Sequence, residues 1–138
     1  MKKKTISKLK KDLDKWFSLY IRLRNSTETG LCQCFTCGKV GHYKKGGMQC
    51  GHFQSRRHLA TRWHDINCQV QCVKCNMFEQ GEQFKFALNL DATYGFETAE
   101  EMQYLATTTV KITRSEYEEQ ISCYKLLVNK IKKQKGLE

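Results

Sequence analysis

The motifs Cys34-Phe-Thr-Cys37 and Cys72-Val-Lys-Cys75 decide the fold of this chain, and 34 residues separate them. Each motif presents two thiolates about one turn apart, and four thiolates together suit a tetrahedral zinc ion. Because four thiolates leave no open coordination position, such a zinc would be structural. The spacing therefore predicts a structural Zn²⁺ site that ties the segment before residue 38 to a helix starting at the second motif. Redox-active Cys-x-x-Cys pairs or disulfides are the alternatives.

Four further cysteines lie outside this predicted site: Cys32, Cys50, Cys68 and Cys123. Cys32 is close enough in sequence to Cys34 to compete as a ligand, whereas the other three are typical of buried free thiols. The chain is too long to need disulfide staples, and no apolar signal core follows its basic N-terminus. These features favour a reduced, cytoplasmic protein.

A run of polar residues between and after the two motifs has a recognisable order. It comprises Gly51-His52-Phe53, Arg62-Trp63, Asn67, Gln71-Cys72, Cys75-Asn76, Leu90 and Tyr94-Gly95. This order resembles the zinc-anchored branch of the HNH, or His-Me finger, nucleases, and most closely the lambda-type NinG (Rap) recombination endonucleases. The segment from Cys72 to Asn76 is also similar to that of the phage Holliday-junction resolvase endonuclease VII. The resemblance covers roughly residues 30–95.

The resemblance implies a ββα-metal core in which a hairpin delivers a general base, His52, and a helix delivers a metal ligand, Asn76. The chemistry of the residues agrees, because a neutral imidazole with a pKa near 6.5 can take a proton from water. Phosphodiester hydrolysis also needs a hard divalent cation, Mg²⁺ or Mn²⁺, to neutralise charge on the leaving oxygen. Asn67 matches the middle Asn of the family pattern, whose amide braces the loop and orients the histidine.

One position departs from the family pattern. Many members carry Asp immediately before the base histidine as a second metal ligand, and here that position is Gly51. Two outcomes follow: the catalytic metal is held by Asn76 and water alone, or another side chain supplies the second ligand. The candidates for that second ligand are His58, His64 and Asp65. Under the first outcome, metal affinity in the absence of DNA is expected to be weak.

The charge distribution points to a polyanionic partner, with nucleic acid first. The chain has 24 Lys plus Arg and 14 Asp plus Glu, for a net charge of +10. Residues 39–74 hold seven basic groups against a single acidic one. Arg56 and Arg57 are expected to bind the phosphate or stabilise its transition state, and Arg62 does so or is structural. The predicted DNA-binding set is Lys44, Lys45, Arg56, Arg57, Arg62 and Lys74, and the alternative is a solvated basic surface.

The chain is predicted to form one α+β domain over residues 1–138, with a basic helix in 1–27, the zinc and ββα-metal core in 30–95, and C-terminal helices in 96–138. Apolar residues at helical spacing predict helices over residues 5–24, 83–94 and 113–133. Capping boxes are predicted at Thr98 and Thr113, each followed by Glu at the third position. No apolar run approaches the roughly 18 residues of a membrane span.

These features predict a metal-dependent DNA endonuclease. The family resemblance implies branched recombination intermediates as substrates, such as four-way junctions, D-loops or flaps, and action in the host cell cytoplasm if the chain is phage-encoded. Symmetric cutting of a junction needs two active sites, so the helix over 113–133 is a candidate homodimer element or a lid on the core. The competing hypotheses are a non-catalytic zinc-containing DNA-binding module and a sequence-specific HNH nuclease acting on duplex DNA.

Overall fold

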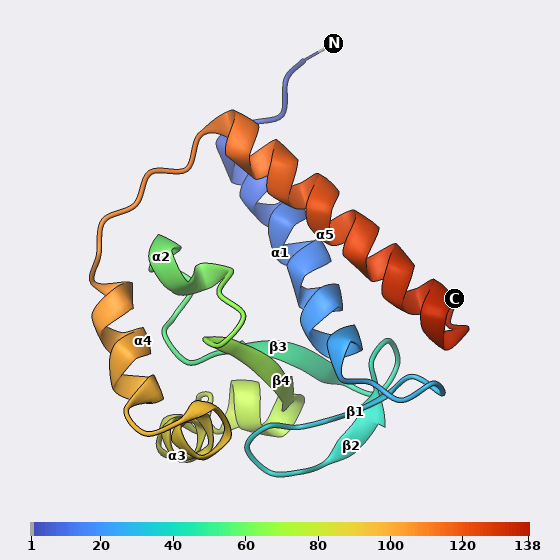
Figure 1. Ribbon diagram of the computed structural model, residues 1–138, viewed down its shortest axis with the longest axis vertical. Helices are drawn as coiled ribbons and strands as arrows, with labels where there is room; N and C mark the ends of the chain where they lie inside the picture. The colour runs from blue at the N-terminus through green and yellow to red at the C-terminus, as the bar shows by residue number, and fades with distance from the viewer. Residues whose placement is uncertain (1) are drawn as a thin grey trace.

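The computed structural model describes residues 2–138 and is a mixed α+β structure in which the two long terminal helices pack side by side (Figure 1). Two small β-hairpins and the shorter helices α2, α3 and α4 lie to the left of and below this helical pair in the same view. The elements in chain order are α1 (Ile6–Arg24), β1 (Leu31–Gln33), β2 (Val40–His42), β3 (Met48–His52), α2 (Leu59–Arg62), β4 (Cys68–Cys72), the π-helical turn η1 (Lys74–Phe78), α3 (Gln83–Tyr94), α4 (Thr98–Ala106) and α5 (Arg114–Lys135).

The helix α1 forms because its apolar residues recur every three or four positions and bury one stripe. Thr5 caps its first turn by accepting a hydrogen bond from the Lys8 amide, at 3.1 Å. Leu13 and Phe17 are fully buried in this stripe, and α1 packs against both α5 and the β3–β4 hairpin. The predicted helix over 5–24 is therefore confirmed, and it forms the centre of the structure.

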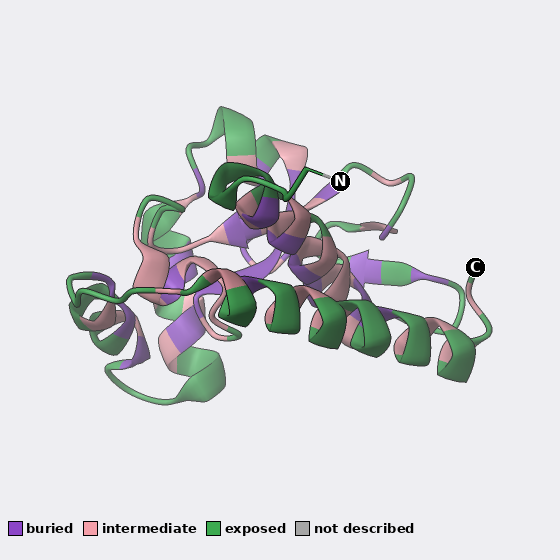
Figure 2. Ribbon diagram, turned by 90° about the horizontal axis from the view of Figure 1, so that it is seen from above, coloured by how far each residue is buried: buried purple, intermediate pink, exposed green. Residues whose placement is uncertain are grey.

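The helix α5 covers α1 and leaves its own outer side exposed, as Figure 2 shows along its length. Tyr117 and Val128 are buried against the core, whereas Leu126 is exposed. The Lys135 ammonium closes the far end of the pair by donating to the backbone carbonyls of Leu23 and Ser26. In this chain α5 thus acts as a lid on α1, which is one of the two roles predicted for it.

The two hairpins build the segment between the terminal helices. Strands β1 and β2 pair antiparallel, and β3 pairs antiparallel with β4 so that His52 lies opposite Cys68. Every residue of β4 is buried, and β4 contacts both α1 and η1. Both hairpins are short, and the β3–β4 hairpin is followed at once by the η1 turn.

The two predicted capping boxes have different outcomes. At α5 the Thr113 hydroxyl accepts from the Glu116 amide and the Glu116 carboxylate accepts from the Thr113 amide, which confirms the capping box. At α4 the prediction is wrong, because Thr98 is the first helical residue and its hydroxyl donates to the Gly95 carbonyl instead. The N-cap there is Glu97, held at a positive φ of 70°.

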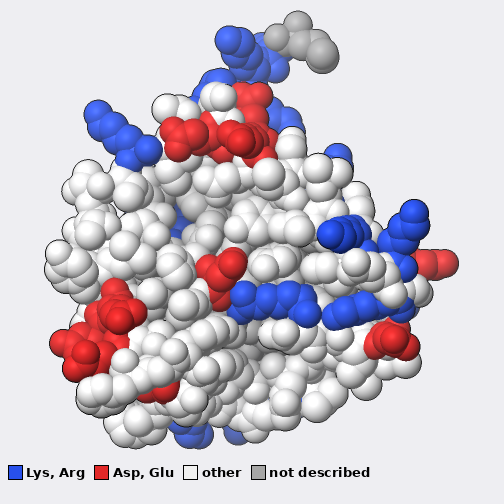
Figure 3. Space-filling view, viewed as in Figure 1, with Lys and Arg blue, Asp and Glu red and all other residues white. Residues whose placement is uncertain are grey.

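Charge is segregated on the surface. In the view of Figure 3, acidic side chains gather over α4 and over the start of α5, while basic side chains gather over the second half of α5. No helix within residues 2–138 is long and apolar enough to cross a membrane. The acidic regions lie outside the segment that carries the candidate site.

Candidate functional site

The four cysteines of the two motifs converge at the junction between the hairpins. The Sγ atoms of Cys34, Cys37, Cys72 and Cys75 all lie within 4.8 Å of one another, and those of Cys37 and Cys72 are 3.6 Å apart. Four thiolates at the usual Zn–S length of about 2.3 Å around a tetrahedral ion have sulfur–sulfur separations of about 3.8 Å. The cluster therefore has the donors and the spacing for a zinc ion, and no disulfide forms within residues 2–138.

The ionisation of this cluster also favours a bound dication. Burial alone would raise the pKa of Cys34, but the Thr36 hydroxyl and nearby backbone groups outweigh it and lower the pKa to about 6. Burial, together with the neighbouring thiols, raises the pKa of Cys75 to about 12. The Cys34 thiol thus loses its proton readily whereas the Cys75 thiol does not, so ionisation of all four thiols needs a compensating cation.

A large open groove of about 1220 Å³ lies beside the four-cysteine cluster, along the edge of β3. Its walls come from α1, from β3 with the loop that follows it, and from η1 with the turn after it. His52 lies in this groove at the last position of β3, and Asn76 enters it from η1. Two of the predicted catalytic residues, 24 positions apart in sequence, therefore line one groove.

The His52 ring is held by a backbone carbonyl. Its Nε2 lies 2.9 Å from the carbonyl oxygen of Arg62, which only accepts hydrogen bonds, so Nε2 carries the proton. The other ring nitrogen, Nδ1, is then left with a lone pair and no proton. Burial is the main cause of the lowered pKa of His52, opposed by the Arg62 carbonyl and reinforced by the Arg56 charge. The imidazole is therefore neutral near pH 7, in the tautomer that can accept a proton at Nδ1.

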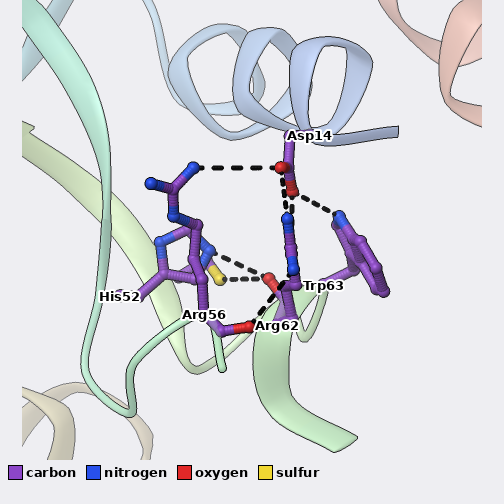
Figure 4. Close-up of polar contacts among 6 residues, drawn as sticks. Asp14, His52, Arg56, Arg62 and Trp63 are labelled. Atoms are coloured by element: carbon purple, nitrogen blue, oxygen red, sulfur yellow. Dashed lines mark hydrogen bonds and ion pairs between the residues drawn. The ribbon is translucent and has the colours of Figure 1, made fainter. Parts of the chain in front are cut away.

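The Arg62 segment is in turn anchored by Asp14 from α1, as Figure 4 shows. The Arg62 guanidinium donates two hydrogen bonds to the Asp14 carboxylate, at 3.1 and 2.7 Å, and the Trp63 indole donates a third at 2.9 Å. Arg56 adds a longer ion pair at 3.8 Å. Sequence reasoning missed Asp14, because its partners are 42 to 49 positions away in the chain and no local motif marks it.

Asn67 braces the loop that carries these residues. Its amide oxygen accepts from the Gln54 backbone amide at 2.7 Å, and its amide nitrogen donates to the Gln54 and Thr61 carbonyls at 3.1 and 3.0 Å. Asn67 is fully buried and does not line the groove. This placement suits the loop-bracing role predicted for Asn67 and leaves it out of direct contact with anything bound in the groove.

Asn76 has one half of its amide free for a ligand. Its side-chain nitrogen donates to the Gln49 amide oxygen at 2.8 Å, which turns the nitrogen toward β3. No protein donor within residues 2–138 bonds its Oδ1. Of the three candidates for a second metal ligand, His58 lines the groove, whereas His64 and Asp65 do not. Among residues 2–138, the only carboxylate lining the groove is that of Asp14, which already bonds Arg62 and Trp63.

The packing around Gly51 leaves no room for a side chain. A Cβ built on Gly51 would lie 2.0 Å from the side-chain oxygen of Gln71. That glutamine is fully buried and is held by hydrogen bonds from its nitrogen to Thr36 and to the Gly81 carbonyl. An Asp at position 51 is therefore incompatible with this packing. The Gln71 oxygen itself has no hydrogen-bond partner within the described residues.

The predicted DNA-binding residues divide between the groove and other surfaces. Arg56 and Arg57 line the groove and are exposed. Lys74 is exposed on η1 but does not line the groove, and Arg62 is held by Asp14 with only 17% of its side chain exposed. Lys44 and Lys45 are exposed in the turn between β2 and β3, also outside the groove lining.

Three basic residues of the groove are absent from the predicted DNA-binding set. Lys11, Lys15 and Arg22 line it from α1, and the two lysines lie on the side of that helix opposite its contacts with the core. The helical spacing of the lysines could have marked them, since both lie off the apolar stripe. The groove thus has basic side chains on two sides of His52.

Comparison with known proteins shows a single family relationship. No curated protein and no solved structure gives a significant match. A family model described as "Bacteriophage Lambda NinG protein" matches residues 1–135, which includes the groove, the four-cysteine cluster and both terminal helices. The chain therefore belongs to the bacteriophage lambda NinG protein family.

Proposed function

We propose that this protein is a metal-dependent DNA endonuclease that hydrolyses phosphodiester bonds with His52 as general base. The observation that carries the proposal is the tautomer of His52, whose Nε2 proton is held by the Arg62 carbonyl. A base needs an unprotonated nitrogen facing its substrate, and Nδ1 is left in that state in a groove lined by basic side chains. Family membership supports the same function.

In this mechanism each residue has a separate task. His52 Nδ1 takes the proton of an attacking water, while Arg56 and Arg57 hold the phosphate and stabilise its added negative charge. A divalent cation such as Mg²⁺ or Mn²⁺, when bound, would neutralise charge on the leaving oxygen. Asn76 would hold that cation through its amide oxygen, with water and phosphate oxygens as the remaining ligands. Because no free carboxylate lines the groove, we expect weak metal affinity before DNA binds.

The proposal includes the arrangement of the core. The β3–β4 hairpin carries His52 and runs into η1, which carries Asn76, and this order agrees with a ββα-metal core on a structural zinc ion. We further propose branched recombination intermediates as substrates, by analogy with the family resemblance. Symmetric cutting of a four-way junction would need two copies of the chain, and the exposed outer side of α5 is available for that pairing.

The decisive experiment is a nicking assay on labelled four-way junction, flap and linear duplex, with Mg²⁺, Mn²⁺ or EDTA. His52→Ala is expected to lower the rate by about 10²- to 10⁴-fold, which is the usual contribution of a general base. His64→Ala is the matched control, because His64 lies outside the groove and only accepts a hydrogen bond from the Ile66 amide. It is expected to retain most of the activity.

Three results would change this conclusion. Binding of every substrate without cutting, under any of the metals, would favour a non-catalytic DNA-binding module. Cutting of linear duplex at fixed positions would favour a sequence-specific HNH nuclease. Equal losses in the His52 and His64 variants would remove His52 from the mechanism.

A further inference from the structure

A second cluster of metal-binding side chains lies on the opposite side of the β3–β4 hairpin from Gly51 and Gln71. Cys50, His52 and Cys68 each offer a donor atom, and these three atoms lie within 4.8 Å of one another. The strand register brings them together, because Cys50 and His52 are two positions apart on β3 and His52 lies opposite Cys68 on β4. The cluster is therefore a consequence of the hairpin and does not depend on a flexible loop.

We propose that Cys50, His52 and Cys68 form a second metal site, selective for a thiophilic divalent ion such as Zn²⁺, which inhibits the enzyme by occupying its base. Two thiolates and an imidazole are the donors of zinc sites with three protein ligands, which keep a fourth position open. Here Cys50 and His52 line the groove while Cys68 is buried behind them, so the open position faces the groove. Mg²⁺ and Mn²⁺ prefer oxygen ligands and would not compete for this site.

The surroundings of the cluster support an ion of this charge. The Cys68 thiol and His52 Nε2 both lie close to the same Arg62 carbonyl oxygen, at 3.3 and 2.9 Å. A dication bound to both thiolates leaves the site neutral, so the nearby guanidinium of Arg56 does not repel it strongly. The fully buried thiol must lose its proton to the ion, which makes this site weaker than the four-cysteine cluster.

Inhibition follows whichever ring nitrogen binds the ion, and this part of the inference rests on the proposed nuclease function. An ion on Nδ1 occupies the lone pair that would accept the proton from water. An ion on Nε2 displaces the proton held by the Arg62 carbonyl and moves it to Nδ1, which then has no lone pair to offer. In both cases the imidazole cannot act as a base.

The binding arm of the test uses Co²⁺ as a spectroscopic probe without DNA. Protein that retains the zinc of its four-cysteine cluster is titrated with Co²⁺, and thiolate-to-cobalt absorption is recorded for the wild type, Cys50→Ser, His52→Ala and Cys123→Ser. Cys123 is the matched control, because it is an exposed cysteine on α5 outside both clusters. We expect saturable absorption in the wild type and the control, and its loss in the other two variants. Absorption that is equal in all four proteins, or absent from the wild type, would overturn the proposal.

The activity arm adds Zn²⁺ to nicking reactions at constant Mg²⁺, with each variant compared with its own zinc-free rate. Saturating Zn²⁺ is expected to slow the wild type and Cys123→Ser by about 10²-fold or more, as loss of a general base would. Cys50→Ser is expected to need far more Zn²⁺ for the same inhibition. Equal inhibition of wild type and Cys50→Ser would refute the inhibitory role. A wild type that never cuts DNA would refute the proposed function alone, since the Co²⁺ titration still decides whether the site exists.

Discussion

The two terminal helices are similar in character and different in role. Both α1 and α5 are long, rich in lysine and amphipathic, and both begin with a threonine cap. However, α1 lies between α5 and the β3–β4 hairpin, whereas α5 packs chiefly on α1. As a result α1 supplies Lys11, Asp14 and Lys15 to the groove, and α5 supplies nothing to it. The position of a basic helix between its neighbours, and not its composition, therefore decides whether it takes part in the site.

The largest difference between the helices is expected in stability. Leu13 of α1 is fully buried, and its replacement by Ala should lower the free energy of unfolding by about 2–5 kcal/mol, because a cavity remains in the core. Leu126 of α5 is 70% exposed, and Leu126→Ala should change it by less than about 0.5 kcal/mol. Denaturant unfolding of the two variants measures both effects. Comparable losses would show that the outer side of α5 is covered in solution, as in a homodimer.

The next largest effect is expected in the nicking rate, where two aspartates of α1, Asp14 and Asp12, should differ. Asp14 holds the segment whose carbonyl orients His52, so Asp14→Asn should lower the nicking rate by about 10- to 100-fold, as loss of a supporting residue around a catalytic group does. Asp12, the matched control, pairs only with the exposed Lys4 and Lys8. Asp12→Asn should keep the wild-type rate. A similar loss in both variants would mean that Asp14 acts through general helix stability.

The pH dependence of nicking by Asp14→Asn and Asp12→Asn distinguishes a positioning role of Asp14 from an effect on helix stability. Burial lowers the pKa of His52, and the Asp14 charge opposes this shift. Activity should therefore rise with pH through a midpoint below the ordinary 6.5, because only neutral His52 accepts a proton. Asp14→Asn removes the opposing charge and should move that midpoint to still lower pH. The pH–rate profiles of Asp14→Asn and Asp12→Asn measure this directly, and an unmoved midpoint would contradict the link.

The smallest expected effect concerns the lysines of the two helices. Lys11→Ala with Lys15→Ala should weaken DNA binding and reduce the slope of log K against log salt by up to about 2, one for each lost phosphate contact. Lys130→Ala with Lys133→Ala on α5 removes the same charge from exposed positions outside the groove. That pair should leave the slope nearly unchanged. Equal slopes for the two double variants would show that binding follows net charge instead of the groove.

Local patterns predicted much of the secondary structure. The helix over 83–94 was placed correctly because Gly95 ends it with a φ of 122°, which favours glycine. The four-cysteine cluster followed from spacing alone. The error at Thr98 has a local cause as well, since the Thr98 hydroxyl donates to the Gly95 carbonyl and the helix begins at Thr98, one residue earlier than predicted. The end of the helix at Gly95 and the error at Thr98 depend on contacts within a few residues, whereas the cysteine cluster joins two local motifs that are distant in sequence.

The candidate site was predictable only in part, because its geometry depends on contacts between distant segments. His52 and Asn76 could be selected from residue type and order. The tautomer of His52 could not, because it is decided by the Arg62 carbonyl, ten residues away, and the side chain of Arg62 is held by Asp14. Arg62 was left open between a phosphate ligand and a structural residue, and its paired contact with Asp14 favours the second.

The fit between Gly51 and Gln71 has an evolutionary consequence. A side chain at position 51 would begin with a Cβ that meets the Gln71 oxygen at 2.0 Å. The order of mutations therefore matters: a shorter residue at 71 must come first, after which Asp becomes acceptable at 51. Substitutions at the two positions are thus expected to have non-additive effects.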